Sequence, residues 1–230
     1  MAIKLTTARQ SAVTNGIKCL VYGPSGVGKT SLIKTAKNPL IISAESGLLA
    51  LRDTDIPVIE VRTVSDVHEA YQFCTSEECA GFDWICLDSI SEIAEVCLVS
   101  EKAIAKDPRQ AYGALSDQVT ELVRAFRDLP GKNVYFAAKQ ERVKDELTGA
   151  MLYSPSMPGQ KLGYGLPYFF DEVFCLRAEK DETGTVVRML QTQPDYQYSA
   201  KDRSGALDAY EIPDLSHIQE KIMSATTNQA

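Results

Sequence analysis

The chain has 230 residues, with 31 acidic against 24 basic side chains and a formal net charge of −7. This charge excludes a general polycation, so any contact with nucleic acid would need a local basic patch and would weaken with salt. No apolar run reaches the roughly 18 residues of a membrane helix, and the N-terminus lacks a secretory apolar stretch. We therefore expect a soluble, cytoplasmic protein with one main domain.

Alternating apolar strands and amphipathic helices predict an α/β fold with a mostly parallel central sheet. The expected strands cover residues 17–22, 39–43, 58–61, 84–87, 134–138 and 172–178, followed by antiparallel strands at 186–191 and 196–199. The expected helices cover residues 29–37, 65–79, 91–103 and 112–129. We divide the chain into an N-terminal segment (1–16), a core (17–225) and a flexible tail (226–230). Cys19, Cys86 and Cys175 fall inside strand-like runs and are interpreted as core residues.

Residues 23–30 read GPSGVGKT, which matches the phosphate-binding pattern G-x-x-x-x-G-K-[ST] in full, between a strand candidate and a helix candidate. Glycines let successive N–H groups turn toward an anion, and a helix N-terminus adds positive potential. Lys29 is expected to reach the β- and γ-phosphates, and Thr30 to offer its hydroxyl to Mg²⁺. The expected nucleotide-binding residues are Gly23, Pro24, Ser25, Gly26, Val27, Gly28, Lys29, Thr30 and Ser31.

An acidic residue at the end of a later strand is a candidate for the metal shell. Asp88 follows the apolar run 84–87, and sites in open α/β sheets lie at the carboxyl ends of strands. The next residue is Ser89, where many P-loop ATPases carry their water-activating glutamate. Either hydrolysis is poor, or the carboxylate comes from another strand. Glu45, just after the strand at 39–43, could approach the γ-phosphate through one water.

Two segments combine cations, tyrosines and irregular patterning, and we expect both to be functional loops. The first, residues 102–113, contains Lys106 and Arg109. The second, residues 142–166, contains Arg142, Lys144 and Lys161.

Three strand ends resemble the RecA-type ATPase core: Ala44-Glu45, Leu87-Asp88-Ser89 and Ala138-Lys139-Gln140. The resemblance spans roughly residues 16–206. It implies a RecA-like three-layer α/β/α P-loop fold that ends in an antiparallel hairpin, and a catalytic glutamate on a neighbouring strand, which is Glu45 here. It further implies that Gln140 senses the γ-phosphate and couples it to a DNA loop, with Lys139 as the second candidate. The catalytic residues expected on this basis are Lys29, Glu45, Asp88 and Gln140.

The same resemblance assigns the two irregular segments to DNA loops that contact single-stranded DNA. It also implies a homo-oligomer, either a ring or a filament, in which Lys201 and Arg203 reach the nucleotide of the adjacent subunit. A cation supplied in this way can accelerate hydrolysis by roughly 10³–10⁵. Adenine over guanine is likewise what the family implies, since the sequence has no Asn-Lys-x-Asp motif.

The chain also looks like short phage-encoded RecA-like proteins that act in recombination and single-strand annealing, often beside a single-strand-binding protein. That resemblance implies a DNA-stimulated, Mg²⁺-dependent ATPase in the host cytoplasm. Two alternatives stay open. One is a P-loop ATPase that serves a protein partner in phage assembly or regulation, without DNA activity. The other is a small-molecule kinase, for which Arg142 is the candidate lid arginine.

Overall fold

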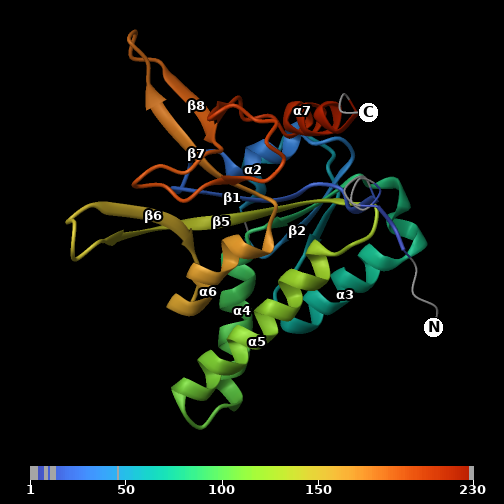
Figure 1. Ribbon diagram of the computed structural model, residues 1–230. Coiled ribbons are helices and arrows are strands. Elements are labelled where there is room, and N and C mark those ends of the chain that lie inside the picture. Colours follow the sequence, from blue (N-terminus) through green and yellow to red (C-terminus); the bar gives the residue numbers. More distant parts are fainter. Residues whose placement is uncertain (1–4, 8–9, 11–13, 46, 228–230) are drawn as a thin grey trace.

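The structure, a computed structural model, describes residues 5–7, 10, 14–45 and 47–227. Within these residues ten strands form one sheet, in the order β10-β8-β7-β1-β5-β4-β2-β3, with β6 paired to β5 and β9 paired to β7 (Figure 1). The strands are β1 (Lys18–Gly23), β2 (Pro39–Ser43), β3 (Val58–Glu60), β4 (Trp84–Asp88), β5 (Asn133–Lys144), β6 (Met151–Ser156), β7 (Glu172–Lys180), β8 (Val186–Gln191), β9 (Lys201–Asp202) and β10 (Tyr210–Glu211).

The centre of the sheet is parallel, as the sequence predicts. Strand β1 pairs in parallel with β5 and β7, and β4 joins β5 to β2 in the same direction. Every residue of β1, β2 and β4 is buried, because helices cover both faces of these apolar strands. The outer pairs β5–β6, β7–β8, β7–β9 and β8–β10 are antiparallel. The fold is therefore the α/β P-loop architecture with a mostly parallel central sheet, and its antiparallel hairpin is formed by β7 and β8.

The helices form a layer on each face of the sheet (Figure 1). They are α2 (Lys29–Leu32), α3 (Val64–Thr75), α4 (Ile90–Ile104), α5 (Pro108–Arg127), α6 (Gln160–Gly165) and α7 (Leu215–Thr227). One core cluster packs α3, α4 and α5 against one face, and a second packs α2 and α7 against the other. Cys19, Cys86 and Cys175 are fully buried in these clusters, which confirms their interpretation as core residues. Within the described residues no helix is long and apolar enough to cross a membrane.

Both segments predicted as loops are mostly regular structure, so that prediction is wrong. In residues 102–113, helix α4 continues to Ile104 and α5 begins at Pro108. Asp107 caps α5 by accepting a hydrogen bond from the backbone N of Arg109 (2.8 Å). Aspartate followed by proline is a helix-start signal, and it places Arg109 in the first turn of α5.

In residues 142–166, strand β5 runs on to Lys144 and returns as β6, after which the chain forms the short helix α6. Asp145 closes the connecting turn by accepting hydrogen bonds from Thr148, and Gly149 follows at a φ of 73°. Such a hairpin has no continuous apolar run because both of its faces are largely exposed at the tip. Periodicity therefore did not reveal it.

Smaller corrections concern element ends. The helix predicted for residues 29–37 is a four-residue α2 followed by a 3₁₀ turn, Ile33–Thr35. The strand predicted for residues 196–199 is a single parallel bridge between Tyr198 and Tyr153. The tail predicted for 226–230 is helical up to Thr227, and residues 228–230 lie outside the described part. Most of the predicted N-terminal segment (1–16) also lies outside it, so the domain division stays a prediction.

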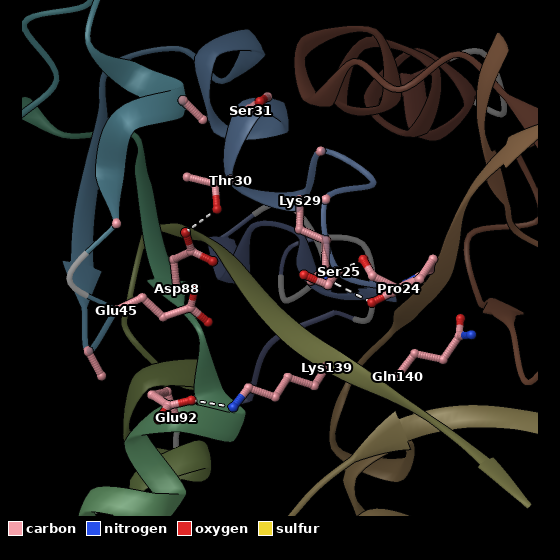
Figure 2. Close-up of a pocket in the computed structure, with 16 residues that line it drawn as sticks. Pro24, Ser25, Lys29, Thr30, Ser31, Glu45, Asp88, Glu92, Lys139 and Gln140 are labelled. Carbon is pink, nitrogen blue, oxygen red and sulfur yellow. Dashed lines mark hydrogen bonds and ion pairs between the residues drawn. The ribbon is translucent and has the colours of Figure 1, made fainter. Parts of the chain in front are cut away.

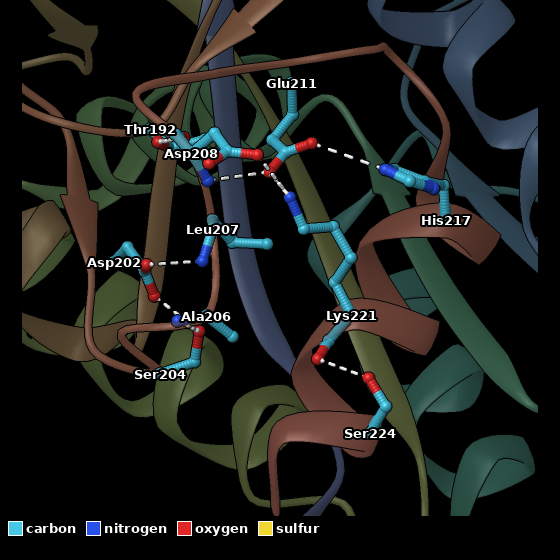
Figure 3. A network of polar contacts seen from close by, with 10 residues as sticks. All are labelled: Thr192, Asp202, Ser204, Ala206, Leu207, Asp208, Glu211, His217, Lys221 and Ser224. Atoms are coloured by element: carbon cyan, nitrogen blue, oxygen red, sulfur yellow. Dashed lines mark hydrogen bonds and ion pairs between the residues drawn. The ribbon is translucent and has the colours of Figure 1, made fainter.

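Helix α7, which we did not predict, is attached to the sheet by a polar network around Glu211 of β10 (Figure 3). The buried Glu211 carboxylate bonds Lys221 of α7, and its Oε2 lies 3.3 Å from Nε2 of His217. At the start of the helix, the backbone N of Leu215 donates to Thr35 Oγ1 (2.8 Å). These contacts hold α7 against the 3₁₀ turn that follows α2.

A second buried carboxyl group should make the stability depend on pH. Glu172, at the start of β7, is 2% exposed and lies opposite Asp202 of β9. Burial, followed by the charge of Asp202, raises the pKa of Glu172 to about 8. Because the folded state then holds a proton that the unfolded chain releases near pH 4, this contribution to stability is full at low pH and is lost as pH rises through about 8.

We therefore expect Glu172→Gln to reduce the fall in unfolding free energy between pH 5 and pH 8.5 by more than about 1 kcal/mol. Urea denaturation at the two pH values measures the difference. The matched control is Glu182→Gln, which changes an exposed glutamate in the β7–β8 turn. An unchanged pH dependence in Glu172→Gln would contradict the assignment.

Candidate nucleotide site

The P-loop follows β1 at the carboxyl edge of the sheet and borders a cavity of about 790 Å³. Gly26 and Gly28 adopt φ angles of 75° and 111°, a region that favours glycine. A Cβ on Gly23 would lie 2.6 Å from the carbonyl oxygen of Leu176 in β7, so this glycine permits close packing of β1 and β7. The cavity is also lined by Ala44, Glu45, Gly47, Asp88, Glu92, Lys139 and Gln140 (Figure 2).

Lys29 bonds to the P-loop itself. Its Nζ donates to the carbonyl oxygens of Gly23 (2.8 Å) and Pro24 (3.0 Å). Burial lowers the pKa of Lys29, against the opposing charges of Asp88 and Glu45. The hydroxyl of Tyr135 in β5 donates to the carbonyl oxygen of Lys29 (2.9 Å) and anchors the start of α2. Nothing in the apolar sequence around Tyr135 indicated this contact.

Thr30 and Asp88 meet across the cavity, as their sequence positions predict. The hydroxyl of Thr30 donates to Oδ2 of Asp88 at 2.6 Å. Asp88 ends β4 and is 2% exposed, and burial raises its pKa to about 6. A hydroxyl and a carboxylate side by side are hard oxygen ligands, which fit Mg²⁺. Among the described residues no three His, Cys, Asp or Glu side chains gather at a metal site, so a Mg²⁺ here would take further ligands from water and phosphate.

Glu45 lies beside Asp88 and is held by Ser89, the residue after Asp88. Oε1 of Glu45 accepts a hydrogen bond from Oγ of Ser89 (2.8 Å), and the backbone N of Ala44 donates to the carbonyl oxygen of Asp88 (3.2 Å). Ser89 also caps α4 by accepting from the backbone N of Glu92. From the sequence, Ser89 is notable only because it replaces a glutamate. Its hydrogen bond to Glu45 is not predictable from the sequence.

Lys139 and Gln140 line the same cavity from β5. Lys139 forms an ion pair with Glu92 of α4, and its backbone N donates to Ser91 Oγ (2.9 Å). Oε1 of Gln140 lies 3.8 Å from Sγ of Cys175 in β7. Gln140 therefore touches both the cavity and the next strand, whereas Lys139 is engaged by α4.

The five predicted DNA-contacting cations are all exposed, but they lie on three separate segments (Figure 1). Lys106 and Arg109 lie at the α4–α5 junction, Arg142 and Lys144 on the β5–β6 hairpin, and Lys161 in α6. Lys161 shares a groove of about 520 Å³ between α5 and α6 with Tyr112. The structure thus pairs one predicted cation with an aromatic side chain but does not gather all five in one patch.

Lys201 and Arg203 lie far from the chain's own P-loop. Lys201 belongs to β9, which pairs with the start of β7, and Arg203 lies in the turn after β9. The start of β7 is at the amino ends of the parallel strands, whereas the P-loop is at their carboxyl ends. Nζ of Lys201 donates to the carbonyl oxygen of Pro167 (2.7 Å), and Arg203 forms an ion pair with Asp171 (3.1 Å). Their role toward a second copy stays a prediction.

The buried carboxylate of Asp88 should cost stability in the absence of ligand. Because its folded pKa is above the unfolded value, the folded state loses stability as pH rises through about 6. We expect Asp88→Asn to raise the unfolding free energy at pH 8 by about 1–2 kcal/mol while weakening Mg²⁺-dependent ATP binding. Urea denaturation and calorimetry measure these effects, with the exposed Asp55→Asn as control. A variant less stable than wild type at pH 8 would refute this account.

Comparison with known proteins identifies the family of this chain. The AAA domain family (AAA_24) matches residues 15–204, more than half of the chain. A search of curated proteins found no match. Among solved structures, the RadB recombinase is similar at 12% identity and a TM-score of 0.43, over 79% of this chain and 90% of that one. The family match includes the P-loop, Glu45 and Asp88, and we conclude that this protein belongs to the AAA domain family of P-loop ATPases.

Proposed function

We propose that this protein binds and hydrolyses Mg²⁺-ATP and that single-stranded DNA stimulates the hydrolysis, in homologous recombination or single-strand annealing. One observation carries the proposal. Thr30 of the P-loop bonds Asp88 at 2.6 Å and Ser89 bonds Glu45 at 2.8 Å, so that a candidate pair of Mg²⁺ ligands and a fixed carboxylate line one cavity.

Each of these residues has a distinct task in the proposal. Lys29 exchanges its carbonyl partners for the β- and γ-phosphates, and Thr30 and Asp88 hold Mg²⁺, which when bound neutralises phosphate charge. Glu45 orients the attacking water as a general base. The hydroxyl of Ser89 donates to Oε1 of Glu45 and so fixes the carboxylate, while no hydrogen bond from the described residues engages Oε2, which is available to the water.

The connection to DNA rests on the course of β5. Gln140 lines the phosphate cavity, and Arg142 and Lys144 follow it on the same strand, within the exposed hairpin. A displacement of Gln140 on loss of the γ-phosphate would therefore pass directly to these cations. We propose that they contact the phosphates of the strand, together with Lys106, Arg109 and Lys161.

The assembly completes this proposal. We propose a ring or filament in which Lys201 and Arg203 exchange their contacts within the chain for the nucleotide of the next copy. The resemblance to phage annealing proteins supports a single-strand-binding protein as a further partner and the host cytoplasm as the location.

An ATPase that serves a protein partner is the second candidate. It is favoured by the net charge of −7 and by the distribution of the five candidate DNA cations over three separate segments. This candidate predicts the same nucleotide site with turnover indifferent to DNA.

Steady-state ATP hydrolysis, with and without single-stranded DNA and over a range of protein concentrations, separates the two. We expect strong stimulation by DNA and a steep dependence on protein concentration.

Two variants test the residues of the nucleotide site. Lys29→Ala should lose ATP binding, and Glu45→Gln should keep it while turnover falls by about 10²–10³-fold. Glu60→Gln, at the exposed end of β3, is the matched control. Turnover unaffected by DNA would reject the DNA-directed proposal, and wild-type turnover in Glu45→Gln would reject the role of that residue.

The DNA contacts have their own test. We expect the triple variant Arg142→Ala/Lys144→Ala/Lys161→Ala to bind single-stranded DNA more weakly and to flatten the salt dependence of binding by about one unit of slope per lost phosphate contact. Fluorescence anisotropy of a labelled oligonucleotide at several salt concentrations measures both. A triple variant of the exposed cations Lys37, Arg62 and Lys180 is the control. Equal slopes in the two variants would move the DNA contact elsewhere.

A further inference from the structure

Arg188 of β8 contacts the P-loop from the hairpin formed by β7 and β8. Nε of Arg188 donates to the carbonyl oxygen of Val27 at 2.9 Å. Its Cδ and Nε lie 3.7 and 3.6 Å from the position that a Cβ on Gly28 would occupy. Among the described residues, no hydrogen bond or ion pair engages its two terminal nitrogens. Nε thus fixes the guanidinium at the P-loop, and the described part of the chain leaves its planar end available to a ligand.

Arg188 borders a second cavity, of about 330 Å³. Gly26, Gly28 and Ser31 line both this cavity and the larger one described above, so the two spaces meet around the P-loop. The remaining walls are apolar and come from Leu32, Leu176 and Pro213. Apolar walls with few polar groups are typical of sites for small molecules and cofactors.

The strand order gives the direction in which a bound nucleotide must extend. Strands β5, β4 and β2 lie on one side of β1. Gln140 lies in β5, Asp88 ends β4, and Glu45 follows the end of β2 by two residues. The terminal phosphate belongs on that side. Strands β7 and β8 lie on the other side of β1, where the second cavity is. The nucleoside end of the ligand therefore leaves the P-loop toward β8.

We propose that the second cavity receives the ribose and base of the nucleotide and that the guanidinium of Arg188 stacks on the base. This inference rests on the proposed nucleotide binding and deepens it. Arginine suits this position because its guanidinium is planar, remains charged and stacks on aromatic faces, while Nε keeps its bond to Val27. In this proposal the β7–β8 hairpin contacts the nucleoside of the bound nucleotide and not its phosphates.

Calorimetric titration with Mg²⁺-ATP and with Mg²⁺-tripolyphosphate, which lacks a nucleoside, tests this assignment. We expect Arg188→Ala to weaken ATP binding by about tenfold and to leave tripolyphosphate binding unchanged. Arg188→Lys should not restore ATP binding, because an ammonium group lacks the planar surface. The control is Lys180→Ala, which removes an exposed cation from the same hairpin and should bind both ligands like wild type.

Each outcome bears on the inference. Unchanged ATP affinity in Arg188→Ala would overturn it, and an equal loss for both ligands would show a phosphate contact and overturn the stacking role. A wild-type protein that binds neither ligand would overturn the inference and the proposed function together. If the wild type binds ATP without hydrolysing it and the Arg188→Ala variant binds ATP more weakly, the inference holds and the proposed function alone is refuted.

Discussion

The parallel pairing of β1 with β5 and β7, inside a sheet covered on both faces, is the constraint from which the site follows. Parallel strands bring their carboxyl ends to one edge, so the P-loop, Glu45, Asp88 and Gln140 must meet there. The register is held by fully buried side chains such as Tyr22, since a shift by one residue would turn them to the opposite face. The same apolar burial that stabilises the core thus directs Asp88 into the cavity.

The site itself works against the stability that the sheet provides. Asp88 is nearly buried with a raised pKa, and burial lowers the pKa of Lys29. Charged groups are costly in such surroundings unless hydrogen bonds satisfy them. Here the hydroxyls of Thr30 and Ser89 supply these bonds to the two carboxylates. In the proposed function, the phosphates and the metal of the bound nucleotide complete this cluster.

Two hairpins extend this edge beyond the buried sheet. The β5–β6 hairpin begins where Gln140 lines the cavity, and the β7–β8 hairpin returns to the P-loop through Arg188. Both continue buried strands, so the displacement of Gln140 in the proposed function would reach the β5–β6 hairpin through continuous backbone. The sequence suggested a loop for the first of these because its side chains are exposed on both faces. Exposed strands carry no apolar periodicity, and their pairing depends on the partner strand.

The sequence by itself determined the P-loop, the buried parallel strands and the Asp88 strand end, because each is a local pattern with a fixed spacing or a continuous apolar run. The tertiary structure decided that Ser89 holds Glu45, 44 residues away, and that Arg188 reaches Val27, 161 residues away. Contacts at such separations depend on strand order and register. These are set by the packing of the whole sheet, which no single stretch of the chain encodes.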